Sequence, residues 1–336
     1  MYDSFSAHLM PLINSSFAPG QAQATVDAFQ DPDQRQIAQA ELYYFSGRAQ
    51  ECRNIVELYL QDKDLCLRLS AGLLYSFSNL TLGNPSASRM GFRNIQECLR
   101  LAEENSASEE VIASCVFAGY LATVLMHLPA DGLPPLKDFL PYLPAGIRAY
   151  AIYILAHNAY LNEEYERALG LCQSVFLMLD GCYPIAMEYL YCVIIMCLNN
   201  QKKHEEAREI LMKAWNMAKP DGFLEPFIEH HGLMLGQIEA CIKPTEPENY
   251  KRLSQAVIAF SRGWMDIHNP QLQSSVTDKL TPMEFSIAML ASKGWTNQEI
   301  ADHLSMSVNT IKHYLSRIFQ ILGVEKREEL KPFVNK

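Results

Sequence analysis

The stretch LTPMEFSIAMLASKGWTNQEIADHLSMSVNTIKHYLSRIFQILGV, residues 280–324, decides the fold of the C-terminal part of this chain. Its segments TPME at 281–284 and TNQE at 296–299 each place a hydroxyl at a helix N-cap and a carboxylate three residues later, which is a capping box. Pro282 suits the first turn of a helix. Ser307 begins a third helix, and Gly323 ends it. The spacing therefore predicts helix starts at 282, 297 and 308.

The second and third of these helices, residues 297–304 and 308–322, are separated by three residues only. Two helices joined so tightly must cross steeply, which is the geometry of a helix-turn-helix. On the third helix, apolar residues at 308, 311, 315, 318 and 322 form one continuous stripe, which predicts a core face. The opposite face carries side chains that can hydrogen-bond to base edges and phosphates in a major groove: Asn309, Lys312, His313, Ser316, Arg317 and Gln320.

These segments resemble the DNA-binding domain of the LuxR (GerE) family. LTPME at 280, GWTNQEIADHL at 294, SVNTIKHYL at 307 and ILGV at 321, followed by Arg327, occur in the family's order and spacing without a gap. The resemblance implies a four-helix domain whose third helix, residues 308–322, enters the major groove. It also implies that a fourth helix, at about residues 326–334, supports dimerisation.

The resemblance also implies which residues contact DNA. Lys312 stands at the position of the family's helix lysine, and His313 and Ser316 stand at flanking positions that face bases. Arg317 is of the type that grips phosphate more often than it reads sequence. The remaining DNA-binding candidates are Thr296, Asn297, Ser307, Asn309 and Thr310, most of them as phosphate contacts. For His313, the role of a plain surface histidine is an equal alternative, and we expect Trp295 and Tyr314 to be packing residues.

Three positions depart from the family's pattern. Met283 replaces the usual arginine before the first-helix glutamate, Tyr314 replaces a histidine, and Ile321 replaces a basic residue. We expect the fold to tolerate these changes and the affinity for DNA to be lowered by them.

The region before this domain predicts an all-α helical repeat. Residues 149–161 and 165–179 form a helix pair with a short polar turn, and residues 187–198 and 204–218 repeat the plan about 39 residues later. A weaker copy lies at residues 40–45 and 49–60. Such pairs bury their apolar faces only by stacking into a solenoid. They resemble tetratricopeptide repeats, and residues 218–229 are similar to the arm of the maltose-regulator type of LuxR-family activators.

The domain organisation follows from these patterns and from charge. We predict a helical-repeat sensor and interaction domain at residues 1–265, a linker at 266–278 and the helix-turn-helix domain at 279–336. The whole chain of 336 residues carries a net charge of -10. Residues 279–336 hold eight Lys and Arg against six Asp and Glu, so this domain carries +2 and the rest carries -12. The excess of acidic residues therefore lies in residues 1–278, which contain the helical-repeat region, here called the arm. It does not lie in the predicted DNA-binding domain.

Enzyme, cofactor and membrane motifs are not found in the sequence. It contains no phosphate-binding loop, no GxSxG elbow and no HExxH, and its nine cysteines form no CxxC pair. Glu229-His230-His231 is better explained as a helix-surface cluster than as a metal site, because adjacent residues do not share a helical face. We therefore expect a non-enzymatic, cytoplasmic protein without a cofactor, whose cysteines are reduced.

The function predicted is a transcriptional regulator that binds double-stranded DNA as a homodimer. The arm has two interpretations: a scaffold for dimerisation and for RNA polymerase or another protein, or an enclosure for a small-molecule effector. The second rests on aromatic residues that core filling explains better than a pocket does: Tyr150, Tyr153, Tyr160, Tyr189 and Tyr191. The alternative function is a protein-interaction scaffold with a degenerate helix-turn-helix.

Overall fold

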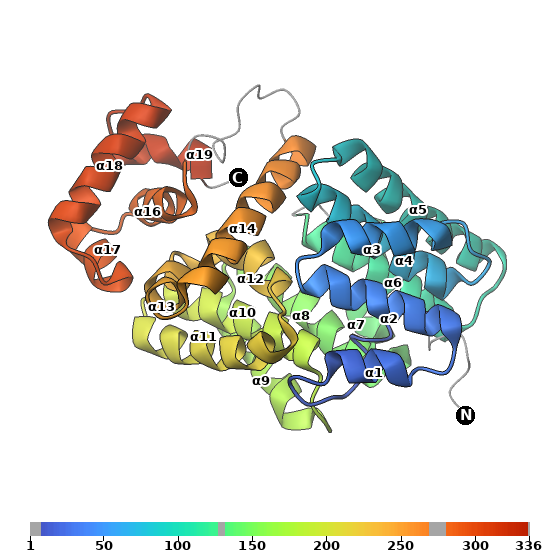
Figure 1. The fold of residues 1–336 in the computed structure, drawn as a ribbon. Coiled ribbons are helices and arrows are strands. Elements are labelled where there is room, and N and C mark those ends of the chain that lie inside the picture. The colour runs from blue at the N-terminus through green and yellow to red at the C-terminus, as the bar shows by residue number, and fades with distance from the viewer. Residues whose placement is uncertain (1–7, 127–131, 269–279, 335–336) are drawn as a thin grey trace.

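The computed structural model describes residues 8–126, 132–268 and 280–334, and within these the chain is helical without a β-strand (Figure 1). The arm comprises α1 Ala22–Ala28, α2 Pro32–Phe45, α3 Ala49–Val56, α4 Leu65–Thr81, α5 Pro85–Glu104, α6 Glu109–Val124, α7 Leu136–Phe139, α8 Ala145–Leu161, α9 Tyr165–Met178, α10 Pro184–Asn200, α11 His204–Ala218, α12 Glu225–His230, α13 Gln237–Thr245 and α14 Pro247–His268. The C-terminal domain comprises α16 Pro282–Ser292, α17 Asn297–Leu304, α18 Val308–Leu322 and α19 Lys331–Val334. Short 3-10 turns include η4 Lys219–Asp221, η5 His231–Met234 and η6 Arg327–Leu330. The all-α prediction is confirmed.

The arm is built from antiparallel helix pairs, including the three predicted ones, α2/α3, α8/α9 and α10/α11. Their turns share one left-handed backbone conformation. Two residues before the second helix, Gly47, Glu163 and Lys202 have φ of +74°, +61° and +61°. In all three turns, an amide donates to the carbonyl five residues earlier: Arg48 to Tyr43 at 2.8 Å, and Glu164 to Ala159 and Lys203 to Leu198 at 2.9 Å. This is the Schellman ending of a helix. The pair α4/α5 follows the same plan and was not predicted.

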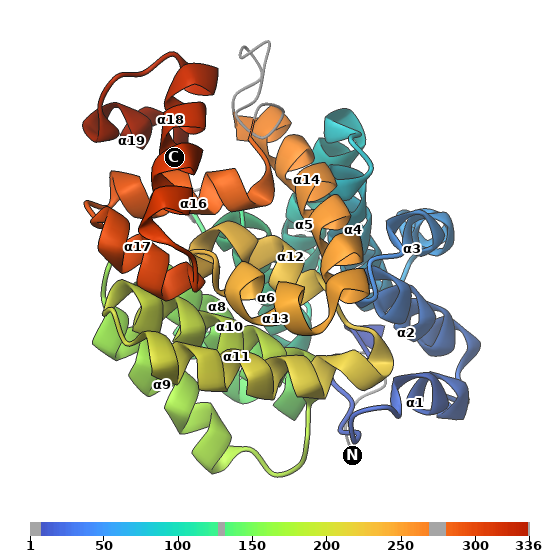
Figure 2. The same cartoon turned by 60° about the vertical axis from the view of Figure 1, so that its left-hand side comes forward.

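Neighbouring pairs pack side by side, so that one hydrophobic core runs through the arm. Helix α14 then crosses back over α4, and Figures 1 and 2 both show it between the helix pairs and the C-terminal domain. The crossing is very close, since a Cβ at Gly263 would lie 1.9 Å from the carbonyl oxygen of Leu80. Only glycine permits this approach of the two backbones.

Residues 8–17 form a segment, here called the inserted segment, that lies within the arm. Leu9, Met10, Leu12 and Ile13 are at most 3% exposed. The buried Glu41 carboxylate of α2 accepts hydrogen bonds from the amides of Leu12 at 2.8 Å and Ile13 at 3.0 Å. Burial nevertheless raises the pKa of Glu41 to about 8. Sequence periodicity did not indicate this insertion, because the segment is not helical along its length.

The cluster Glu229-His230-His231 was predicted to lie on a helix surface, and this prediction is wrong. Both histidines are buried, and His231 Nε2 lies 2.6 Å from Oε1 of Glu239. His230 Nε2 lies 3.0 Å from the hydroxyl of Tyr153. The histidines are buried because α14, α10 and η5 pack around the short helix α12. Among the residues that the structure describes, no group of three His, Cys, Asp or Glu side chains could hold a metal ion.

The predicted linker at residues 266–278 is only partly covered by the structure. Helix α14 continues to His268, three residues beyond the predicted end of the arm, and residues 269–279 lie outside the described residues. The nine cysteines are free, and seven of them are buried. No helix in the described part of the chain is long and apolar enough to cross a membrane.

Candidate nucleic-acid interface

The first three helices of the C-terminal domain, α16, α17 and α18, begin where capping chemistry predicted. Thr281 Oγ1 accepts the amide of Glu284 at 3.3 Å, and Glu284 Oε2 accepts the amide of Thr281 at 2.8 Å. The same reciprocal pair joins Thr296 and Glu299, at 3.2 Å and 2.7 Å. Ser307 Oγ caps α18 by accepting the amide of Thr310 at 3.1 Å. Each cap satisfies amides that a helix start leaves without a partner.

The apolar stripe of α18 forms part of the domain core, as predicted. Ile311, Leu315, Ile318 and Leu322 are buried, and Val308 is half-buried. Trp295 and Met283 are buried in the same core. Met283 therefore replaces the arginine of the family's pattern with a side chain that packs, which explains why the fold tolerates this departure.

The opposite face of α18 is open to solvent. Asn309, Lys312, His313, Ser316, Arg317 and Gln320 are all exposed, and the arm contacts the domain through α16 and α17. Figure 1 shows α18 on the far side of the domain from the helix pairs of the arm. The polar face is thus accessible while the domain rests on the arm.

Arg317 is anchored within the domain. Its Nε lies 3.0 Å from Oε1 of Glu284, the carboxylate that also caps α16. Glu284 is almost fully buried, whereas the Arg317 side chain remains 65% exposed. The ion pair orients the guanidinium at the edge of the exposed face, from which it can still reach a phosphate.

Several residues expected to contact phosphates make hydrogen bonds within the domain. Thr296, Ser307 and Thr310 hydroxyls take part in helix caps, and the hydroxyls of Ser307 and Thr310 lie 2.8 Å apart. The side-chain oxygen of Asn297 accepts a hydrogen bond from Arg327. Thr296 and Asn297 therefore lie at the start of α17, and Ser307 and Thr310 lie at the start of α18. The N-terminus of a helix favours anions such as phosphate.

A contact between the arm and α17 was not foreseen from the sequence. His303 of α17 is 1% exposed, and its Nε2 donates to the carbonyl of Leu235 at 2.6 Å. Arg208 of α11 donates to the carbonyl of His303 at 2.9 Å and to the hydroxyl of Ser305 at 3.1 Å. Leu235 itself belongs to the core of the C-terminal domain. The arm therefore contributes a residue to the domain that carries α18.

Aromatic and charged groups extend this contact. The rings of His204, Trp295 and His303 lie within 4.6 to 5.2 Å of one another. Burial lowers the pKa of His303 to about 4. Lys202 Nζ lies 2.6 Å from Oε1 of Glu299 and, with the Thr296 cap, lowers the pKa of that carboxyl to about 2.

Comparison with known proteins agrees with this geometry. Residues 278–333 match the family described as bacterial regulatory proteins, luxR family. They form a luxR-family helix-turn-helix domain. The chain is also similar to the HTH-type transcriptional regulator MalT of Serratia proteamaculans, at 26% identity over 155 residues, and to that of Klebsiella pneumoniae, at 25% over 143 residues.

These matches cover 40% and 38% of this chain but only 17% and 16% of the two relatives. The chain therefore corresponds to a small part of those proteins. No solved structure matches it.

Proposed function

We propose that this protein is a sequence-specific DNA-binding transcriptional regulator that inserts α18 into the major groove of double-stranded DNA. The observation that supports it best is the exposed polar face of α18 within a luxR-family domain. Lys312, His313 and Ser316 lie on this face as the base-reading residues. The remaining contacts, mainly to phosphates, come from Thr296, Asn297, Ser307, Asn309, Thr310 and Arg317.

We further infer that the protein acts as a homodimer on two half-sites about one helical turn apart, because one small domain contacts too few bases for selectivity. The charge of +2 on residues 279–336 is small for a DNA-binding domain, which also favours two copies. In this proposal residues 1–265 form the sensor and interaction domain, residues 266–278 the linker and residues 279–336 the DNA-binding domain. The arm dimerises or contacts RNA polymerase or another protein in the cytoplasm, and it responds to an effector.

The test is fluorescence polarisation with genomic fragments across a range of salt concentrations. Wild-type binding should weaken steeply as salt rises, because phosphate contacts release counterions. Lys312→Ala should remove most of the specific binding without unfolding the protein. Lys251→Ala, which removes an exposed lysine from α14, is the matched control and should bind like wild type.

Two outcomes would contradict the proposal. Unchanged affinity in Lys312→Ala would mean that α18 does not present this face to DNA. Wild-type protein that binds no fragment above random DNA would favour the alternative, a protein-interaction scaffold with a degenerate helix-turn-helix, which the departures at Met283, Tyr314 and Ile321 also suit.

A further inference from the structure

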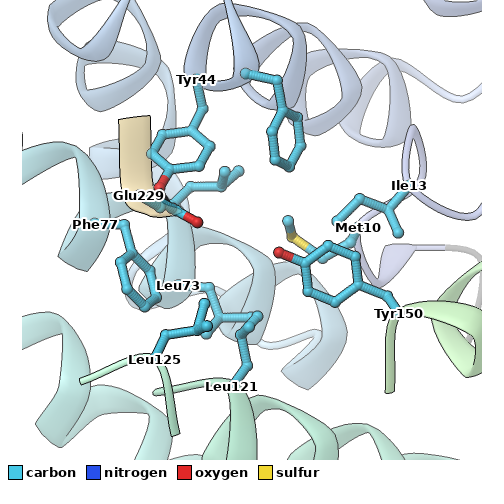
Figure 3. Close-up of a pocket in the computed structure, with 11 residues that line it drawn as sticks. Met10, Ile13, Tyr44, Leu73, Phe77, Leu121, Leu125, Tyr150 and Glu229 are labelled. Carbon is cyan, nitrogen blue, oxygen red and sulfur yellow. Dashed lines mark hydrogen bonds between the residues drawn. The ribbon is translucent and has the colours of Figure 1, made fainter. Parts of the chain in front are cut away.

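The pocket that Figure 3 shows inside the arm lies between the inserted segment and helices α2, α4, α6, α8 and α12. Its volume is about 20 Å³, which is space for about one water molecule. The carboxylate of Glu229 and the hydroxyl of Tyr150 face it among apolar side chains. An organic effector does not fit into so small a space. The contact through which the arm holds the C-terminal domain offers a different means of control.

Two histidines face each other across this contact. His204 begins α11 of the arm, His303 lies near the end of α17, and their ring centroids are 4.6 Å apart. The ring of Trp295 lies against both, at 4.8 Å from His204 and 5.2 Å from His303. His303 is 1% exposed, and His204 is half-buried. The two rings are therefore shielded from water, His303 almost completely, while the domain rests on the arm.

The hydrogen bonds of the contact fit neutral imidazole rings. His303 Nε2 donates to the carbonyl of Leu235 at 2.6 Å, which uses the one proton of the neutral ring. The Nδ1 atoms of His303 and His204 are both buried without a hydrogen-bond partner. A charged imidazolium donates from both of its nitrogens, and a buried charged donor without an acceptor costs free energy. The docked contact therefore excludes the protonated form of each ring.

The charged side chains around the two rings do not compensate for an added proton. Arg208 of α11 and Lys202 of the turn between α10 and α11 disfavour protonation. Burial, with these positive charges, lowers the pKa of both histidines, that of His303 to about 4. Three carboxylates favour protonation, but each already has a partner: Glu205 has Arg208 at 3.5 Å, Glu299 has Lys202 at 2.6 Å and Glu239 has His231 at 2.6 Å.

We propose that His204 and His303 form an acid-sensitive switch that releases the C-terminal domain from the arm. Both rings are neutral in the docked state, and each gains a proton when the contact opens and water reaches it. The state that binds more protons is favoured as pH falls, so acid shifts the protein towards the open contact. The switch goes beyond the proposed function and does not depend on it, because it concerns only the contact between arm and domain.

The pH window follows from His303. Its pKa is about 4 when the domain is docked and 6.5 when the ring is in water. Docking is therefore at full strength above pH 6.5 and weakens as pH falls below it, by up to about tenfold per pH unit for each histidine. At pH 5, His303 alone should raise the open fraction about thirtyfold over its value at pH 7.5.

Amide hydrogen exchange of the full chain from pH 4.5 to 7.5, at constant ionic strength, tests the switch. Rates are corrected for the pH dependence of intrinsic exchange. Protection of the α17 amides should fall about thirtyfold between pH 7.5 and pH 5. Helix α10 of the arm is the internal reference. Exchange in α17 should be faster than in α10 at every pH, because the domain is released while the arm stays folded.

Three variants test the assignment. His303→Gln keeps a group that can donate to Leu235 but does not titrate, so its α17 protection should fall less than about fivefold over the same range. Asp302→Asn removes an exposed titratable side chain next to His303 and, as the matched control, should respond like wild type. If His303→Gln does not fold, His204→Gln decides, since loss of one of the two protons should reduce the wild-type response at pH 5 by about twofold or more.

Three results would overturn the proposal. Protection in α17 does not fall between pH 7.5 and pH 5, the histidine variants that fold respond to pH like wild type, or α17 and α10 exchange at the same rate at pH 5. The last result would mean that acid unfolds the whole chain and does not release the domain.

Discussion

At the scale of single residues, His303 belongs to the helix-turn-helix motif but contacts the arm, which the motif itself does not predict. It lies on α17 among polar residues, yet it is buried against the arm and donates to Leu235. The groups around it are His204 and Arg208, which disfavour its protonation, and Glu239, which favours it. Its Nδ1 is buried without a hydrogen-bond partner. A proton added there would be desolvated and close to positive charge.

His303 should make the stability of the protein depend on pH. Its pKa is about 4 in the folded protein and 6.5 in the unfolded chain, so between these values only the unfolded chain takes up a proton. The stability that His303 contributes is complete above pH 6.5 and falls as pH drops towards 4, by up to about 3 kcal/mol.

Urea unfolding of wild type and His303→Gln, from pH 7 to pH 4.5, measures this effect. The wild-type curve should fall more steeply with decreasing pH than that of the variant. Parallel curves would show that His303 is not held in its neutral form.

At the scale of elements, glycine decides how closely two helices approach. Gly263 lets α14 rest on the backbone of α4 at Leu80, whereas the helical Gly170 of α9 has no atom within 4 Å of where its Cβ would be. Both residues lie within helices, where alanine is favoured over glycine by up to about 1 kcal/mol. The two glycines therefore differ in how closely other atoms surround them and not in their helical conformation.

Gly263→Ala should therefore destabilise the protein by about 1–3 kcal/mol, because the added methyl group forces α14 away from α4. Gly170→Ala, the matched control, should stabilise it by up to about 1 kcal/mol. Urea unfolding measures both. A neutral Gly263→Ala would mean that the two helices separate without loss of packing.

At the scale of the whole molecule, the arm and the C-terminal domain share a hydrophobic contact and leave the polar face of α18 exposed. Leu235 of the arm packs in the domain core, and Arg208 bonds to the end of α17. A Cβ at Gly236 would lie 2.5 Å from Cδ2 of Leu304, so the Leu304 side chain packs directly against the backbone of Gly236. The arm can thus influence how firmly the domain is held without covering the residues proposed to read DNA.

Arg208→Ala should loosen this contact, because the carbonyl of His303 and the hydroxyl of Ser305 lose a charged donor worth about 1.5–3 kcal/mol. We expect amide hydrogen exchange in α17 to speed up roughly tenfold or more, while affinity for DNA changes less than about threefold. The control is Arg167→Ala on α9, whose arginine is 69% exposed and pairs with Glu164 within its own helix region.

A large gain in DNA affinity for Arg208→Ala would contradict this expectation and would mean that docking on the arm restrains DNA binding. Unchanged exchange in α17 would show that the Arg208 hydrogen bonds do not hold the domain.

Local chemistry was enough to predict much of this protein. The helix starts after Thr281, Thr296 and Ser307 and the buried stripe of α18 depend on residues within a few turns of one another, so the sequence alone determined them. The helix pairs on either side of Glu163 and Lys202 follow for the same reason.

Contacts between distant residues were decided only by the tertiary structure. The insertion of residues 8–17, the crossing at Gly263, the burial of His230 and the docking of His303 on Arg208 join segments tens to hundreds of residues apart. The neighbouring sequence does not indicate whether a polar side chain is buried, because the residues that cover it belong to other elements. The exposed face of α18 could therefore be read from the sequence, while the support behind it and the pocket in the arm could not.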